Sequence, residues 1–201
     1  MNSLDSPPSP PPPLESSLDP SARQRLLEIA RQSIRQGLEQ GHALQLIAER
    51  EMSALQAKRA SFVTLERQGR LRGCIGHLQA VTALACDVAE NAYAAAFRDP
   101  RFAPLSAPEF DDLEVHISVL TPSQPLTFSS EAELLAIIEP GIDGLILSEG
   151  SRRGTFLPSV WEQLPNREDF LRHLKQKAGL PPDHWSPHIQ VARYRTESFG
   201  D

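Results

Sequence analysis

The 201-residue sequence has only two cysteines, no long hydrophobic run and no excess of basic residues. Two cysteines are too few for a disulfide framework, so we expect a reducing, cytoplasmic environment. No stretch approaches the roughly 18 apolar residues that cross a bilayer, and the first residues lack the features of a secretory signal. The net charge of −6 argues against a nucleic-acid binder, because such proteins usually carry a basic face. We therefore expect neither a membrane nor nucleic acid as a partner.

Several catalytic and cofactor motifs are also missing. The sequence has no glycine-rich phosphate loop, no CxxC pair and no serine–histidine–aspartate arrangement of recognisable spacing. It lacks the clustered cysteines that would hold an iron–sulfur centre. His184 and His188 have a spacing that suits two metal ligands on a helix, but Pro187 opposes a helix there. We therefore expect no metal and no cofactor.

Composition divides the chain into a tail and a body. Residues 1–20 contain seven prolines and five serines, which predicts a disordered tail with little to bury. Residues 21–201 are long enough for one domain with a sizeable core. In this body, hydrophobic periodicity and turn residues predict helices at 21–41, 43–56, 82–97, 106–109, 130–139 and 166–179, hairpins at 61–78 and 144–158, and strands at 113–120 and 188–199. Interspersed helices and hairpins favour an α+β fold with a mainly antiparallel sheet flanked by helices.

The stretch LRGCIG, residues 71–76, places a cysteine between two glycines. In a strand, Arg72 and Cys74 would point to the same face, about 6.5–7 Å apart at Cα. A guanidinium there, and the N-terminus of the helix from Thr82, would both favour the thiolate, which is the nucleophile. Gly73 and Gly76 would leave room for a ligand. The alternative is that Cys74 is a small buried apolar residue and that the glycines serve packing.

Four polar residues near this stretch are further candidates for a binding site. His77 is close in sequence but should face away from the thiol unless the chain bends after the strand. Asp99 and Arg101 lie on a proline turn, where they could bind an anionic group or could simply end a helix as a local ion pair. His116 lies in mid-strand opposite a valine stripe, as a general base near a cleft or as a half-exposed residue without a role.

Seven segments of the sequence, in this order, resemble the AMMECR family, which is called AmmeMemoRadiSam system protein A in bacteria and archaea. They are FVTL, LRGCIG, NAYAAAFRDPRF, VHISVLTP, GIDGLIL, FLPSVW and FLRHLKQKAGLP. The resemblance covers about residues 25–199. It implies an AMMECR-type domain at 21–201, with a large lobe, a smaller lobe and a cleft lined by the glycine–cysteine motif. The resemblance also implies a functional association with a Memo-type protein and a radical-SAM protein.

Three functions follow from these features. In the first, Cys74 is a nucleophile or acid–base group acting on a small anionic substrate, and Arg72 favours its thiolate. The other substrate-binding residues would then be Gly73, Gly76, His77, Asp99, Arg101 and His116. In the second, the cleft binds a small molecule or peptide for the partner proteins without turnover. The third, a nucleic-acid-associated regulator, is the least favoured because the chain is acidic.

Overall fold

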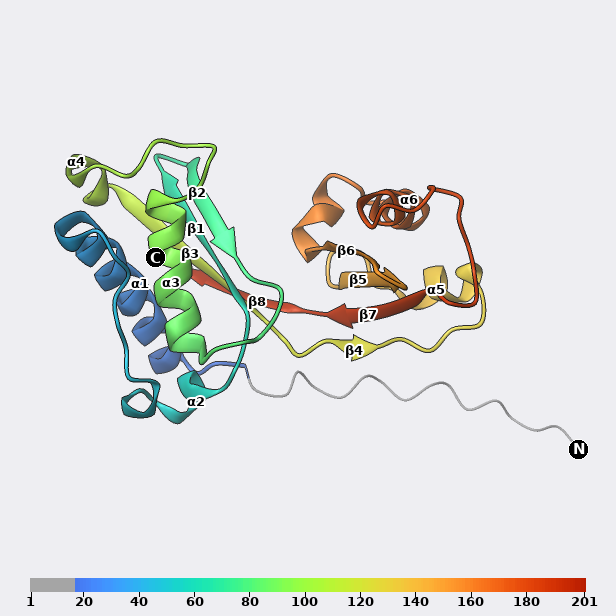
Figure 1. Ribbon diagram of the computed structural model, residues 1–201, viewed down its shortest axis with the longest axis horizontal. Helices are drawn as coiled ribbons and strands as arrows, with labels where there is room; N and C mark the ends of the chain where they lie inside the picture. Colours follow the sequence, from blue (N-terminus) through green and yellow to red (C-terminus); the bar gives the residue numbers. More distant parts are fainter. Residues whose placement is uncertain (1–16) are drawn as a thin grey trace, which may run out of the picture.

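The computed structural model describes residues 17–201, and most of the predicted tail, residues 1–16, lies outside this range (Figure 1). The first helix, α1 (Pro20–Gln40), begins where the Asp19 carboxylate accepts the backbone N–H of Ala22 at 2.9 Å. Leu18 is 4% exposed and belongs to the hydrophobic core. The last residues of the segment predicted as tail therefore take part in the fold. None of the described helices is long and apolar enough to cross a membrane.

The first lobe is an antiparallel sheet covered on one face by helices. Its strand order is β2 (Arg70–Gly76), β1 (Ser61–Arg67), β3 (Leu113–Leu120) and β8 (Thr196–Gly200). Helices α1 and α3 (Leu84–Phe97) pack on this sheet (Figure 1). The remaining helices of the lobe are short: η1 (Ala48–Arg50), α2 (Ser53–Gln56) and α4 (Ala107–Phe110). Strand β2 lies at one edge of the sheet, which leaves one side of its backbone without a neighbouring strand.

Strand alternation gives this sheet two different faces. Val63 and Leu65 of β1, with Val115 and Ile117 of β3, are fully buried against the helices. The residues between them point to the other side, as expected for a strand with a period of two. We call this other side the open face, and it carries Thr64, Glu66, Cys74, Glu114, His116 and Ser118.

The second lobe is a smaller antiparallel sheet with its own core. Its strand order is β4 (Gln124–Pro125), β7 (Gln190–Tyr194), β5 (Gly144–Glu149) and β6 (Arg152–Phe156). It also contains α5 (Glu131–Ile137), η2 (Pro158–Glu162) and α6 (Arg167–Lys177). Trp161 stacks on Phe170 of α6 with ring centroids 3.7 Å apart. The chain is thus an α+β protein with all strand pairs antiparallel, as predicted, but with one sheet in each lobe.

The chain passes between the lobes at two adjacent places. One crossing follows β3, and the other is Arg195 between β7 and β8. The backbone N–H of Thr121 donates to the carbonyl of Arg195 at 2.8 Å, and the N–H of Arg195 donates to Thr121 Oγ1 at 2.8 Å. The predicted single strand at 188–199 is therefore wrong, since it is two strands in two sheets. A small apolar cluster of Ala60, Leu120, Ile146 and Tyr194 joins the lobes beside this crossing.

Candidate functional site

Cys74 lies on the edge strand β2 with its sulfur on the open face. It is half-buried, and its cross-strand neighbour on β1 is Thr64. The hydroxyl of Thr64 donates a hydrogen bond to Cys74 Sγ at 3.2 Å. Cys74 and Cys86 are both free thiols. The sulfur is therefore not sealed under the sheet, and it has one polar neighbour that the sequence did not suggest.

Arg72 does not lie beside this sulfur. A β-bulge makes it the extra residue of β2, because Gly73 pairs with Leu65 whereas Leu71 pairs with the next residue, Glu66. Its Nε donates to Glu109 Oε1 at 2.8 Å, and its Nη2 donates to Glu109 Oε2 at 3.2 Å. These bonds, with further ones from Ser106, lower the pKa of Glu109 to about 2. The expected placement of Arg72 on the face of the thiol is thus incorrect, because its side chain anchors α4 instead.

The two glycines of the motif serve close packing. A Cβ on Gly73 would overlap the backbone carbonyl oxygen of Ala95 in the last turn of α3. A Cβ on Gly76 would overlap the ring of Phe62. These contacts support the interpretation that the glycines serve packing. Gly76 also lines a cavity between the two lobes. Since Gly73 meets the C-terminal turn of α3, the N-terminus of that helix is not aimed at Cys74, contrary to expectation.

Asp99 and Arg101 bind the backbone of Cys74 at the free edge of β2. The Asp99 carboxylate accepts the N–H of Cys74 at 2.9 Å, and Arg101 Nη2 donates to the Cys74 carbonyl at 3.3 Å. The two side chains also pair with each other, with Arg101 Nη2 2.6 Å from Asp99 Oδ2. The Arg101 guanidinium, followed by the N–H of Cys74, holds the pKa of Asp99 well below its usual range. The predicted local ion pair of Asp99 and Arg101 is confirmed. Its side chains occupy the positions that the backbone of a further strand would fill beside β2.

His77 follows β2 and is oriented by a buried carboxylate. Its Nδ1 lies 3.0 Å from Oδ1 of Asp87, whose side chain is 3% exposed. Asp87 also accepts hydrogen bonds from the backbone N–H and the hydroxyl of Ser61, at 2.8 and 2.7 Å, and from Asn91 Nδ2 at 2.9 Å. Because these bonds fix the carboxylate, they also fix the half-exposed imidazole.

A cavity of about 560 Å³ lies between the two lobes. From the first lobe its lining includes Gly76, His77 and Val81, and from the second lobe Leu157 and Lys177. The lining is mostly apolar, and its ionisable groups are the imidazole and the ammonium. Cys74 is not among its lining residues. A second cavity of about 620 Å³ lies against β4, β7 and Trp185 in the second lobe.

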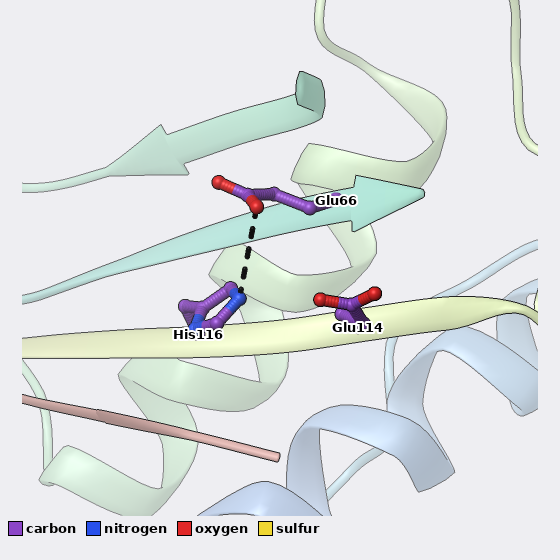
Figure 2. Close-up of side chains that lie close together, drawn as sticks. All are labelled: Glu66, Glu114 and His116. Carbon is purple, nitrogen blue, oxygen red and sulfur yellow. Dashed lines mark ion pairs between the residues drawn. The ribbon is translucent and has the colours of Figure 1, made fainter. Parts of the chain in front are cut away.

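His116 lies in the same cross-strand row as the thiol. The register pairs Thr64 with Cys74 on one side and with His116 on the other. Within residues 17–201, His116 forms a cluster of possible metal ligands with Glu66 and Glu114, whose ligand atoms all lie within 4.8 Å of one another (Figure 2).

Sequence reasoning missed Thr64, Asp87 and Lys177, as well as the possible metal ligands Glu66 and Glu114. The alternation in FVTLER places Thr64 on the polar face, which was the available signal. Nothing local marks Asp87 or Lys177, because Asp87 contacts Ser61 from 26 residues away and Lys177 comes from the other lobe.

A family model described as AMMECR1 matches residues 27–199 of this chain. The chain belongs to the AMMECR1 family. A protein of Methanothermobacter thermautotrophicus is 40% identical over 176 residues, which are 87% of this chain and 91% of that protein. A protein of Thermotoga maritima is 40% identical over 141 residues, 69% of this chain and 76% of that protein.

The AMMECR1 assignment agrees with a solved structure. The crystal structure of the uncharacterised protein PH0010 from Pyrococcus horikoshii is 34% identical, covers 88% of this chain and 89% of that chain, and has a TM-score of 0.75. This likeness confirms the predicted α+β fold class. Membership of the AMMECR1 family does not by itself identify a reaction.

Proposed function

We propose that this AMMECR1-family chain binds a small molecule with an apolar body and an anionic group in the cavity between its lobes. The observation that carries this proposal is the cavity itself. Its volume of about 560 Å³ lies in the range of small-molecule sites, and its mostly apolar lining with few polar groups is typical of them. Among residues 17–201, Lys177 forms no ion pair, and its ammonium lies 5.0 Å from the centroid of the Phe156 ring, where it could also meet an anion at this wall.

His77 gives the cavity a group that can bind or transfer a proton. Asp87 orients the ring through Nδ1, which leaves Nε2 for a ligand. A histidine held by a buried carboxylate is the arrangement used for general acid–base work. It equally suits a fixed hydrogen bond to a bound anion, so the same site serves a binding module and an enzyme.

A ligand screen with matched lysine variants tests this proposal. Thermal-shift measurements with small aromatic and aliphatic carboxylates and phosphates should find compounds that stabilise the protein. Lys177→Met should weaken their binding at least about tenfold, since a charged hydrogen bond contributes about 1.5–3 kcal/mol. Lys58→Met, at an exposed position outside the cavity, should leave it unchanged. Equal loss in both variants would refute the site.

The second candidate is thiol chemistry at Cys74. It is favoured by the half-buried sulfur on the open face and by the Thr64 hydroxyl, which donates to the sulfur at 3.2 Å and fixes its position. Cys86 is a matched control, since it is also half-buried but burial raises the pKa of its thiol. Iodoacetamide should alkylate Cys74 in the Cys86→Ala variant faster than Cys86 in the Cys74→Ala variant. The opposite order would exclude an activated Cys74.

Either function fits an accessory protein of a larger system. The family resemblance implies Memo-type and radical-SAM partners, and we propose that the cavity ligand is shared with them. Co-purification of the three proteins with and without a bound cavity ligand tests this. An association that the ligand strengthens would support sharing, and the absence of any association would contradict it.

A further inference from the structure

Two glutamates and a histidine converge on the open face of the first sheet. Glu66 on β1 and Glu114 on β3 are direct cross-strand partners. His116 lies two residues along β3 on the same face, with its Nε2 3.9 Å from Glu66 Oε2 (Figure 2). All three side chains come from the central strands of a four-stranded sheet, so the sheet hydrogen bonds fix their Cα positions.

The two carboxylates face each other without a permanent cation between them. Like charges directly opposite on neighbouring strands destabilise a sheet. The nearest arginine along β1, Arg67, forms its ion pairs with Asp112 and Glu109 instead. Among the described residues, the ion pair of Glu66 is with His116, and Glu114 has none. A divalent cation would remove this repulsion, whereas the imidazole must gain a proton to do so.

The spacing of the three ligand atoms suits a small metal ion. Metal–nitrogen and metal–oxygen bonds of about 2.0–2.2 Å at tetrahedral angles require ligand atoms about 3.3–3.5 Å apart. The three atoms here lie within 4.8 Å of one another, so small side-chain rotations of the two glutamates bring them into range. One imidazole with two carboxylates favours zinc or a similar first-row ion over magnesium or calcium, which prefer oxygen ligands alone.

We propose that Glu66, Glu114 and His116 form a binding site for a divalent transition-metal ion such as Zn²⁺. Three protein ligands leave the fourth position for water or for a ligand that enters over the open face. This site is separate from the cavity between the lobes, which none of the three residues lines. Metal binding at this site and ligand binding in the cavity can therefore be measured independently of each other.

Zn²⁺ titration of the tag-free protein by calorimetry tests the site. We expect one equivalent to bind with a dissociation constant in the micromolar range or below. His116→Gln and Glu114→Gln should each weaken binding at least about 100-fold, because loss of even an outer-shell partner costs 10–100-fold. Mg²⁺ should bind at least about 100-fold more weakly than Zn²⁺.

His184→Gln provides the matched control. His184 also pairs with a glutamate, Glu149, at 2.9 Å, but the other partner of that glutamate is the hydroxyl of Ser186, and no second carboxylate joins the pair in the described residues. This variant should bind Zn²⁺ as the wild type does. Binding that survives His116→Gln, binding lost in His184→Gln, or Mg²⁺ binding equal to that of Zn²⁺ would each overturn the proposal. Circular dichroism of each variant checks that the fold is retained.

Discussion

The carboxylate of Asp99 accepts the backbone N–H of Cys74 at 2.9 Å, at the sheet edge where β2 has no neighbouring strand. Arg101 completes the arrangement by donating to the carbonyl of the same residue at 3.3 Å. The pair thus imitates the donor and acceptor of an adjacent strand. An exposed edge strand invites pairing with other chains, and this contact covers it at the position of the cysteine.

Asp99→Asn should destabilise the protein. The side chain of Asp99 is 2% exposed and accepts hydrogen bonds from both Cys74 and Arg101. In asparagine an NH₂ group replaces one carboxylate oxygen, and this group would face the N–H donors of Cys74 or Arg101. We therefore expect a loss of at least about 2 kcal/mol in the free energy of unfolding. Urea denaturation measures it. The exposed pair of Arg98 and Glu90 is the control, and Glu90→Gln should change stability by less than about 0.5 kcal/mol.

The pair of Arg72 and Glu109 should make stability depend on pH in the acid range. Hydrogen bonds from Arg72 and Ser106 lower the pKa of Glu109 from 4.5 to about 2. Because the pKa in the folded state lies below that of the unfolded chain, the stabilisation is complete at neutral pH and is lost as the pH falls from about 4.5 towards 2. Denaturation at several pH values should show a smaller acid loss in Glu109→Gln than in the wild type. Parallel curves would contradict this assignment.

Gly73→Ala should be more harmful than a change at the neighbouring cysteine. The added methyl group would meet the carbonyl oxygen of Ala95, which belongs to the backbone of α3 and cannot rotate away. We expect a loss of about 2–3 kcal/mol from this overpacking. Cys74→Ala removes a half-buried sulfur and one hydrogen bond, and should cost about 1 kcal/mol or less. Thermal unfolding of both variants compares them, and similar losses would argue against the packing role of Gly73.

Asp87→Asn should affect both the core and His77. The buried carboxylate accepts from the Ser61 backbone, the Ser61 hydroxyl and Asn91, so the substitution should destabilise the protein by about 2 kcal/mol. His77→Gln, at a half-exposed side chain, should change stability by less than about 0.5 kcal/mol. If His77→Gln proved the more destabilising of the two, the histidine would belong to the core rather than to the cavity.

Local chemistry predicted much of the fold. Ser106 and Glu109 form a capping box at the predicted helix of residues 106–109, and Asn166 caps α6 at the start of the predicted helix of residues 166–179. The alternation in residues 113–120 correctly places His116 opposite the valines. These features depend on residues that are close in sequence, so their patterns are visible there.

Features that depend on distant residues could not be predicted. The bulge at Arg72 reverses the expected direction of its side chain, and no residue type marks it. No glycine or proline within residues 188–199 marks the passage from one sheet to the other at Arg195. The cavity combines His77 with Lys177 from the other lobe, so it exists only once the lobes have docked.

An NMR titration of the isotope-labelled protein with 8-anilino-1-naphthalenesulfonate, an apolar anion of suitable size, decides whether the cavity between the lobes binds a ligand. We predict that the largest backbone shift changes will lie at 76–81, at 155–160 and at Lys177, around the cavity between the lobes. Lys177→Met should reduce them. Changes confined to Trp185 and its neighbours at the second cavity, or an identical response of the Lys177→Met variant, would contradict the proposed site.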